Sequence, residues 1–584
     1  EILHALDIPI DSDDDNCDNF LSDDELLDGL EDLDVFQVDL HPNIEENIDL
    51  NVQNDIAVEK ERSKSPAYRR KTQRVLPDIS NNKKTNKRPI SPVKVYSNVD
   101  WKNGNLIMNE QFIKFSGNTD LPTEIKKLYT PLEFFKYFFD DILLEKILYE
   151  TIQFSIEKNV NKPLKISLDD LKKFIGILVM MSIINLPNSR SFWNETIGNN
   201  IIQNTMSVNK FEEIRKNLHF NDNNKMLPAE NPEHDRLHKI RPLITHLQEK
   251  CKSIPLEENL SIDEQICPTK SRSFLKMYMP LKPHKWGYKL FVLCGVSGFS
   301  YNFEVYTGLE NNSEKRLPSE PNLGACANVV MRLSRCIPEN INHKLYFDNY
   351  YTTLAVMVEL AKKNIHCLGT LRKNRIPGLL LPNENEMKKK PRGFSAECLA
   401  GVDGIPITAI QWKDNKTVSL LSTFVGKEPI SEVQRFDKKL KKRIPVECPK
   451  VVQVYNKHMG GVDLLDSIIG RYRIAMRSKK WYFKLFYHFL DMSLVNAWLL
   501  YRRAYENEAT IPLAKFRQEV AVALCQSGMI STPTRGRKKK EETKNYKKRG
   551  VQTHAPSRDV RYDHIDHFPK VGENRVRCKN EKCN

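Results

Sequence analysis

Apolar residues recur at helical spacing along residues 120–255. In ISLDDLKKFIGILVMMSIINLP, Ser167 and Asp170 have the spacing of a capping box, a dense apolar helix follows, and Pro187 ends it. The segments SVNKFEEIRKNLHF and DRLHKIRPLITHLQEK have the same amphipathic pattern. The sequence therefore predicts a mostly helical region over these residues.

From Leu260 the pattern changes to short apolar runs that are separated by turn residues. FLKMYMP, YKLFVLCGVSG and YNFEVYTG predict strands, ANVVMRLSRCI predicts a helix, and KLYF predicts a buried strand followed by a helix in TTLAVMVELAKKN. Strands and helices in this order indicate an α/β sheet. Residues 373–440 are basic and contain alternating segments such as IPITAIQWKD, which predicts a small β-rich insertion.

The chain returns to a helical pattern from Asp463. One apolar face at three- and four-residue steps predicts a core helix, and its members are Phe486, Phe489, Leu490, Leu494, Ala497, Trp498 and Tyr501. Residues 1–100 lack such patterns. The acidic stretch DSDDDNCDNFLSDDELLDGLEDLDVF cannot bury enough surface to offset chain entropy, so a disordered N-terminus is expected. This acidic tail either binds protein partners or only increases solubility.

Charge adds a candidate partner to this picture. The net charge is +15, but residues 1–50 contain eighteen acidic residues and no Lys or Arg, so the rest of the chain carries +33 (15 plus 18). A basic body of this size favours nucleic acid as the partner over a merely soluble surface. KERSKSPAYRRKTQRV, NNKKTNKRPISPVK and RGRKKKEETKNYKKRG are basic segments, typical of nuclear-localisation or DNA-contacting arms and also of solvated linkers.

Cysteine use and hydropathy restrict the compartment. The twelve cysteines have no close spacing until the end of the chain, which indicates a reducing environment. The longest apolar run, FIGILVMMSIINL at 174–186, has thirteen residues and is too short to span a bilayer, so no membrane association is expected. The first residue is Glu rather than Met, which predicts that the chain is a fragment.

Three widely separated segments place carboxylates at the ends of predicted elements. NLSIDEQ places Asp263 just before the strand region, KLYFDNYYTT ends a strand on Asp348, and HMGGVDLLD places Asp463 and Asp466 after two glycines. The last two would share one face of a helix. Each position also has a structural interpretation, because Ser261 to Glu264 has capping-box spacing, Asp348–Asn349 suits an Asx turn, and Asp463 suits an N-cap.

Taken together, such carboxylates can converge at one edge of a sheet. Mg²⁺ prefers hard oxygen ligands and usually takes few protein carboxylates, and two such ions can assist an in-line displacement at phosphorus. The residues alone leave convergence and separate structural roles equally open.

The chain resembles the piggyBac transposase family from about Leu121 to Arg503. The resemblance is carried by FIGILVMMSIINLPNSRSFWN, MSVNKFEEIRKNLHFNDN, DRLHKIRPL, LSIDEQ, the strand after MYMPLKPHKWGYK, LYFDNYYTT, LGTLRKNR and YNKHMGGVDLLD, in the family's order. It implies an RNase H-like catalytic core inserted into a mostly helical domain for dimerisation and DNA binding.

The resemblance and the residue patterns together divide the chain into eight expected parts. These are a disordered acidic and then basic tail (1–100), the first part of the helical domain (101–255), the RNase H-like core (256–372), the β-rich insertion (373–440), the last part of the core (441–470), the second part of the helical domain (471–530), a basic linker (531–570) and the start of a truncated Cys-rich zinc domain (571–584).

The resemblance also implies an activity. Family members are cut-and-paste DNA transposases that cut at TTAA sites and excise through a hairpin on the transposon end, with two Mg²⁺ ions. The family's catalytic, metal-binding acids fall on Asp263, Asp348 and Asp463, with the additional acid on Asp466. The implied partners are transposon ends, the TTAA target and a second copy of the chain, and the implied location is the nucleus.

Further family positions fall on basic, aromatic and sulfur-containing residues. The DNA-contacting pair falls on Arg372 and Arg375, which could clamp phosphates or be ordinary surface arginines. The aromatic residue near the cleaved end falls on Trp481, which could stack on an unpaired base or only pack. Cys578 and Cys583 match the first ligand pair of a C-terminal zinc domain, but a structural Zn²⁺ needs four ligands, so a zinc site is expected only in a complete domain and free thiols remain the alternative.

Two functions are therefore open. The first is a Mg²⁺-dependent nuclear transposase, which the four acids favour. The second is a domesticated, transposase-derived nuclear protein that binds DNA or regulates chromatin without transposition.

Overall fold

The computed structural model describes residues 93–107, 110–271, 273–280, 282, 284–308, 316–437, 440–506 and 510–528. These residues belong to one compact unit that ends at Gly528. The greater part of the expected N-terminal tail, the basic linker at 531–570 and the expected zinc domain at 571–584, with Cys578 and Cys583, lie outside the described residues.

The helices that the 3.6-residue periodicity predicts are present before residue 255. Ser167 Oγ accepts the backbone N–H of Asp170, and the Asp170 carboxylate accepts the N–H of Ser167, so the predicted capping box begins this apolar helix. The chain leaves the helix at Ile184, before Pro187. The helices are α3 (Glu110–Ile113), α4 (Thr123–Lys126), α5 (Pro131–Phe138), α6 (Asp141–Lys158), α7 (Leu168–Ile183), α8 (Asn200–Thr205), α9 (Val208–Asn217) and α10 (Arg241–Lys252), with short 3₁₀ turns η1 (Ser191–Trp193), η2 (Asn223–Lys225) and η3 (His238–Ile240).

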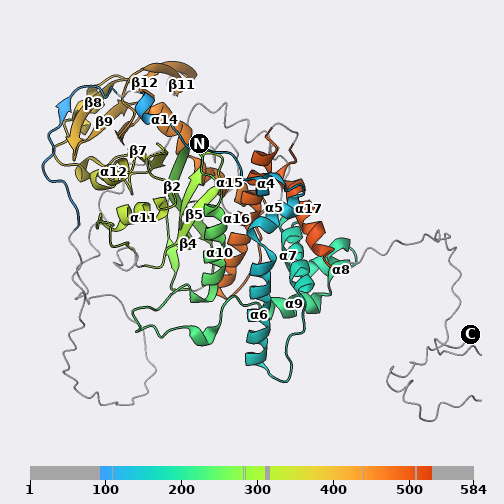
Figure 1. Ribbon diagram of the computed structural model, residues 1–584. Helices are drawn as coiled ribbons and strands as arrows, with labels where there is room; N and C mark the ends of the chain where they lie inside the picture. The colour runs from blue at the N-terminus through green and yellow to red at the C-terminus, as the bar shows by residue number, and fades with distance from the viewer. Residues whose placement is uncertain are drawn as a thin grey trace, which may run out of the picture. The chain divides into compact units, whose positions relative to one another are not determined.

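A ten-stranded mixed sheet follows (Figure 1), in which strand order is β1-β8-β9-β10-β7-β6-β2-β4-β3 and β5 also pairs with β4. Strands β2, β6 and β7 are mutually parallel, and the other pairings are antiparallel. The strands are β1 (Lys102–Asn103), β2 (Asn259–Pro268), β3 (Lys276–Tyr278), β4 (Trp286–Gly295), β5 (Ser300–Val305), β6 (Lys344–Phe347), β7 (His366–Thr370), β8 (Ser395–Val402), β9 (Ile405–Lys413) and β10 (Thr417–Ser422).

The two faces of the sheet carry different helices. Helices α11 (Ala325–Ser334) and α12 (Leu354–Ala361) pack on each other and against β4, β5 and β7. Helices α14 (Lys450–His458), α15 (Gly461–Arg471) and α16 (Trp481–Ala504) pack against β2, whose successive side chains point to opposite faces. Tyr346 and Leu368 belong to a separate apolar cluster under α14, while their neighbours Leu345 and Cys367 belong to the main core. Burial on both faces explains why these strands are continuously apolar.

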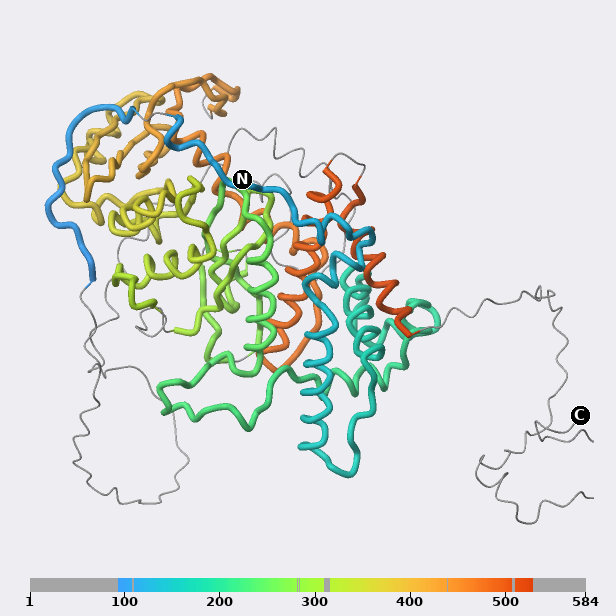
Figure 2. The backbone as a smooth tube through the Cα atoms, in the orientation of Figure 1, coloured from blue at the N-terminus to red at the C-terminus, as the bar shows by residue number. Residues whose placement is uncertain are grey.

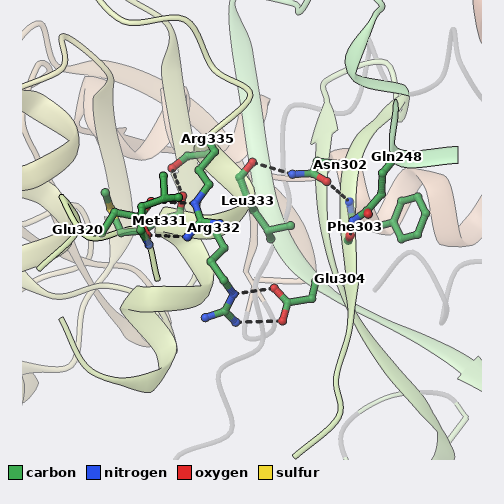
Figure 3. A network of polar contacts seen from close by, with 11 residues as sticks. Gln248, Asn302, Phe303, Glu304, Glu320, Met331, Arg332, Leu333 and Arg335 are labelled. Carbon is green, nitrogen blue, oxygen red and sulfur yellow. Dashed lines mark hydrogen bonds and ion pairs between the residues drawn. The ribbon is translucent and has the colours of Figure 1, made fainter. Parts of the chain in front are cut away.

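Polar contacts hold α10 and α11 to β5 (Figure 3). Arg332 of α11 donates two hydrogen bonds to the carboxylate of Glu304, and Asn302 Nδ2 donates to the carbonyl oxygen of Leu333. On the other side of this strand, Gln248 Nε2 of α10 donates to the carbonyl oxygen of Phe303 at 2.6 Å. Strand β5 is therefore fixed on both sides by side chains that reach from helices.

The segment predicted as a β-rich insertion extends the central sheet. Strands β8, β9 and β10 continue it through the antiparallel pairing of β10 with β7, and a short turn η5 (Lys373–Arg375) and helix α13 (Glu384–Lys389) precede them. A second, two-stranded sheet is formed by β11 (Ser431–Asp437) and β12 (Lys442–Cys448). Since β12 pairs with β11, this hairpin crosses the expected boundary at residue 440. The division into domains otherwise stays a prediction.

Helix α16 occupies a central position. Figure 1 shows it between the strands of the sheet and the helices α5 and α17 (Leu513–Cys525), and it contacts β2, α5 and α17. Residues 482–500, except Lys484, are accordingly buried around the whole circumference of the helix. This arrangement confirms the predicted core helix and explains why its apolar pattern extends beyond one face.

The expected N-terminal disorder does not include residues 93–100. The backbone N–H of Lys94 donates to the carbonyl oxygen of Asn322, and the hydroxyl of Tyr96 donates to Asp403 at 2.7 Å. Farther along, β1 pairs with β8, and Glu397 Oε1 accepts the N–H of Leu106. Figure 2 shows this blue segment passing along the yellow strands. Local sequence patterns could not predict these contacts, because their partners lie hundreds of residues away.

No helix among the described residues has the length and apolar character that crossing a membrane requires.

Candidate active site

Asp263 lies inside strand β2, whereas the sequence pattern placed it before the strand. The alternation of side chains puts Ser261, Asp263 and Gln265 on the face that meets α15 and α16, and puts Glu264 on the opposite face. Ser261 and Glu264 are part of an extended strand, so the capping-box interpretation of this segment is wrong. The strand continues past Asp263 because β4 pairs with it from Leu260 to Pro268.

Asp348 follows the last residue of β6, next to β2. The parallel register pairs Ile262 with Phe347, so the next step along both strands sets Asp263 beside Asp348 at roughly the 4.8 Å spacing of neighbouring strands. Asp348 Oδ1 also accepts the backbone N–H of Tyr350 at 2.8 Å, which forms the Asx turn that the sequence suggested. Asp348 therefore forms the Asx turn and also lies beside Asp263, so the two interpretations of this residue do not exclude each other.

Helix α15 brings Asp463 and Asp466 to the same strand. Its N-cap is Gly460 and Asp463 lies in its first turn, so the N-cap interpretation of Asp463 is wrong by three residues. The helix can begin this close to the sheet because Gly461 has no side chain. A Cβ there would lie 2.3 Å from the carbonyl oxygen of Gly295 and 2.8 Å from Oγ of Ser261.

These carboxyl groups are close enough to change each other's ionisation. Burial raises the pKa of Asp263 well above its ordinary value, and the charges of Glu264, Asp463 and Asp348 raise it further. Burial and the charge of Glu264 raise the pKa of Asp348 to about 6. Burial likewise raises the pKa of Asp466 to about 6. The fold therefore places Asp263, Asp348 and Asp466 where negative charge is poorly solvated, whereas the side chain of Asp463 is 62% exposed.

Lys282 lies among these carboxylates, and the sequence interpretation had given it no role. Its Nζ is 3.8 Å from Oδ1 of Asp463, and its side chain is only 23% exposed. Burial lowers the pKa of Lys282, but the surrounding carboxylates, Asp263 first, raise it by more, so the net shift is upward and the ammonium stays charged. The only available signal was its position in the MYMPLKPHKWGYK motif.

Glu264 is a second residue that the sequence interpretation passed over, having treated it as a capping partner. The hydroxyl of Tyr351 donates to its Oε2 at 2.7 Å, and Nζ of Lys289 lies 3.7 Å from its Oε1. Glu264 is thus a fifth carboxylate in the same neighbourhood, fixed by contacts on the other face of β2.

Arg372 and Arg375 both reach the turn that carries Asp348. Nε of Arg372 donates to Asn349 Oδ1 at 2.8 Å, and Nη1 of Arg375 donates to the carbonyl oxygens of Asn349 and Tyr350 at 2.9 Å each. Both side chains are exposed. They therefore brace the turn while their guanidinium groups remain open to solvent beside the carboxylates.

Trp481 begins helix α16 near the end of β2. Its ring makes edge contacts with Phe274 and Tyr482, with centroid distances of 6.1 and 5.7 Å, and it is partly exposed. Phe274 is itself 65% exposed. The structure thus places Trp481 in an aromatic group at the surface, and its role toward DNA stays a prediction.

The carboxylates lie in one neighbourhood, and the chemistry of these donors decides whether they suit a metal ion. Within the described ranges, no three His, Cys, Asp or Glu side chains are arranged to hold a metal by themselves. Mg²⁺ usually needs only one or two protein carboxylates, because water and phosphate complete its shell. The donors fit this chemistry, since they are oxygen ligands whose mutual repulsion a cation would relieve. In the described structure, Oδ1 of Asp466 is also buried without a hydrogen-bond partner.

A family model and two relatives of similar sequence agree on the kind of protein that this chain resembles. A family model described as transposase IS4 matches residues 130–498. The chain is 30% identical over 457 residues to the Homo sapiens PiggyBac transposable element-derived protein 3, across 77% of this chain and 72% of that protein. It is 29% identical over 459 residues to the Homo sapiens PiggyBac transposable element-derived protein 2, with the same coverage of 77% and 72%.

A solved structure has the same fold. The cryo-EM structure of a piggyBac transposase synaptic complex with hairpin DNA is similar with a TM-score of 0.57 and 22% identity, over 70% of this chain and 82% of that chain. The large mixed sheet and the helices around it are therefore shared.

Proposed function

The chain belongs to the piggyBac family of transposases, and from this premise we propose that it is a cut-and-paste DNA transposase that acts at TTAA sites. The observation that carries the proposal is the register of β2 and β6, which sets Asp263 beside Asp348 while α15 presents Asp463 and Asp466 to the same strand. Carboxylates gathered at one strand edge are what a metal-assisted phosphoryl transfer needs.

The strand order supports an RNase H-like core within this proposal. Strands β5, β4 and β2 are antiparallel neighbours, and β6 and β7 follow parallel to β2. Helices α4–α10 and α16–α17 would form the helical part for DNA binding and for dimerisation. A homodimer, a nuclear location and two Mg²⁺ ions belong to the same proposal.

The reaction is a series of phosphoryl transfers. Water attacks a phosphodiester at the transposon end and frees a 3′-OH, which attacks the opposite strand and closes a hairpin. Opening of the hairpin and attack of the 3′-OH on target DNA follow. Each step exchanges one P–O bond for another, so no covalent bond between protein and DNA is required. Mg²⁺ held at Asp263, Asp348, Asp463 and Asp466 would supply activation of the attacking oxygen and stabilisation of the leaving one.

The remaining residues would position the DNA. Arg372 and Arg375 present exposed guanidinium groups beside the Asp348 turn, where they could bind the phosphates that flank the reacting one. Trp481, partly exposed at the end of β2, offers a ring on which an unpaired base could stack. Lys282 would exchange its carboxylate contacts for phosphate oxygens once cations neutralise the site.

An excision assay on a TTAA-flanked cassette tests the proposal. We expect the wild-type chain to excise the cassette and Asp348→Asn to reduce excision to background, because a neutral amide replaces a carboxylate of the site. Asp120→Asn, at an exposed aspartate outside the site, should retain wild-type excision. Equal excision by wild type and Asp348→Asn would remove the catalytic assignment.

A second function is favoured by one observation. The human relatives are named as transposable element-derived proteins, which fits a domesticated protein that binds DNA or regulates chromatin without transposition. Absence of product from the wild type, together with retained DNA binding, would favour this alternative.

A further inference from the structure

A buried glutamine connects the carboxylates to helix α16. Gln265 is fully buried in β2, two residues after Asp263 and on the same face. Its Oε1 lies 2.8 Å from Nε2 of His488 in α16. Its Nε2 has no hydrogen-bond partner among the described residues. A buried hydrogen-bond donor without a partner destabilises the folded state, so the presence of this amide in the core needs an explanation.

The oxygen of the Gln265 amide, rather than its nitrogen, lies against His488. Burial lowers the pKa of His488 to about 3, so its ring is neutral at physiological pH and carries one N–H. A carbonyl oxygen can only accept, so Nε2 of His488 must donate to Oε1 of Gln265. The amide nitrogen of Gln265 is then turned away from the histidine.

Asp466 of α15 is the carboxylate on which the Gln265 amide acts. Helix α15 packs on β2, and the amide of Gln265 acts to lower the pKa of Asp466 against the effect of burial. Within the described structure, Oδ1 of Asp466 is also buried without a hydrogen-bond partner. An amide nitrogen and a carboxylate oxygen, both buried without a hydrogen-bond partner in the described residues, therefore lie on two elements that pack against each other.

We propose that Gln265 and His488 are positioning residues for Asp466: His488 orients the Gln265 amide, and the amide N–H holds the Asp466 carboxylate in place for a divalent cation. The inference deepens the proposed function and rests on it. It also gives α16 a direct connection to the site, through side chains that are 223 residues apart in the sequence. Groups that orient metal-binding carboxylates typically contribute about 10–100-fold to metal affinity.

Binding of Mn²⁺ to the full chain, followed by the electron paramagnetic resonance signal of the free ion, tests this inference without requiring catalysis. We expect Gln265→Leu to weaken Mn²⁺ binding by about 10-fold or more. The matched control is Gln411→Leu, because Gln411 is also a glutamine in a strand, is 1% exposed, and has an Oε1 without a hydrogen-bond partner in the described residues. Equal Mn²⁺ affinity in the two variants would overturn the inference.

A pair of substitutions at His488 separates orientation from packing. His488→Gln places an amide N–H where Nε2 of the imidazole was, so we expect it to keep Mn²⁺ affinity within about threefold of wild type. His488→Leu fills the space without a donor and should weaken binding as Gln265→Leu does. If both variants weaken binding equally at matched melting temperatures, the contact is only packing and the inference fails.

The two proposals can fail separately. Wild-type excision with unchanged Mn²⁺ affinity in Gln265→Leu would remove the positioning role and leave the transposase. Weakened Mn²⁺ binding in Gln265→Leu, with no excision by the wild type, would remove the transposase and leave the positioning role.

Discussion

At the scale of single residues, the main feature of the site is that burial disfavours the ionised form of its carboxyl groups. Asp263, Asp348 and Asp466 all have a raised pKa, and burial is the largest cause for each. Lys282 is one of the cations that the chain itself supplies to them. Such a site is stabilised when further positive charge arrives, which is the property that the proposed metal-assisted reaction would need.

The raised pKa of Asp348 predicts how stability depends on pH in the presence of a chelator. Its pKa of about 6 in the folded protein exceeds the ordinary value of 3.8, so the folded state binds the proton more tightly than the unfolded chain. The contribution of this group to stability is therefore lost as pH rises from about 4 to about 6, and it does not return at higher pH.

Asp348→Asn removes this titration and keeps an oxygen that can accept the N–H of Tyr350. We expect the variant to be more stable than wild type above about pH 6, by on the order of 2 kcal/mol, and the difference to fall toward zero near pH 4. Urea denaturation in EDTA across this range measures the difference. A difference that is constant with pH would show that Asp348 does not carry a raised pKa.

At the scale of elements, strand β2 and helix α16 assemble the site from parts that are distant in sequence. Strand β2 carries Asp263 and Gln265 on one face and Glu264 on the other. Helix α16 packs on β2, where the backbone carbonyl of Lys484 accepts from the Cys267 thiol. The same helix carries Asp491, which forms an ion pair with Arg517 of α17 inside the core. Helix α16, like α10, thus joins the helical part to the sheet.

The pair of Asp491 and Arg517 predicts a large effect on stability. Arg517 Nη2 donates to Asp491 Oδ1 and to Ser182 Oγ, both at 2.7 Å, and the two charged side chains are 1% and 0% exposed. We expect Arg517→Met to lower the free energy of unfolding by about 3–5 kcal/mol, because it leaves a buried carboxylate without its cation.

Two controls make this prediction specific. Arg190→Met breaks an ion pair with Glu212 in which the arginine side chain is 67% exposed, and it should destabilise the protein much less than Arg517→Met does. The double variant Asp491→Leu with Arg517→Met should be less destabilised than Arg517→Met alone, since no buried charge is left. Thermal and urea denaturation measure all three, and equal losses for Arg517→Met and Arg190→Met would contradict the prediction.

At the scale of the whole molecule, charge is distributed unevenly along the chain. The net charge is +15, although residues 1–50 contain eighteen acidic residues and no basic one. A basic body attracts DNA through its phosphates, and an acidic segment of the same chain competes for the same positive surface. DNA affinity should therefore depend on both salt and the acidic segment.

Deletion of residues 1–50 tests this balance. We expect the shortened chain to bind duplex DNA more tightly at about 50 mM salt, and the advantage to shrink toward about 200 mM as screening weakens both effects. Fluorescence anisotropy with a labelled duplex measures the affinities. Replacement of the segment by a neutral one of equal length controls for its size, and unchanged affinity at low salt would contradict the prediction.

Local patterns in the sequence were sufficient for the elements and for several of their ends. Ser167 and Asp170 predicted a helix start because a capping box involves only residues three positions apart. KLYF predicted a buried strand that stops before Asp348, and the helical face from Phe486 to Tyr501 predicted a core helix. The four acids that the resemblance selected also lie in one neighbourhood, and their catalytic roles stay predictions.

Only the tertiary structure decided how these elements meet. The register of β2 against β6 sets Asp263 beside Asp348, and packing places Lys282 among the acids and His488 against Gln265. The sequence interpretation missed these last residues because a lysine in a loop, or a histidine on an apolar helix, has no distinctive local pattern. Periodicity reports which face of an element is apolar, whereas contacts between distant segments depend on strand pairing and side-chain packing, which no short window of sequence contains.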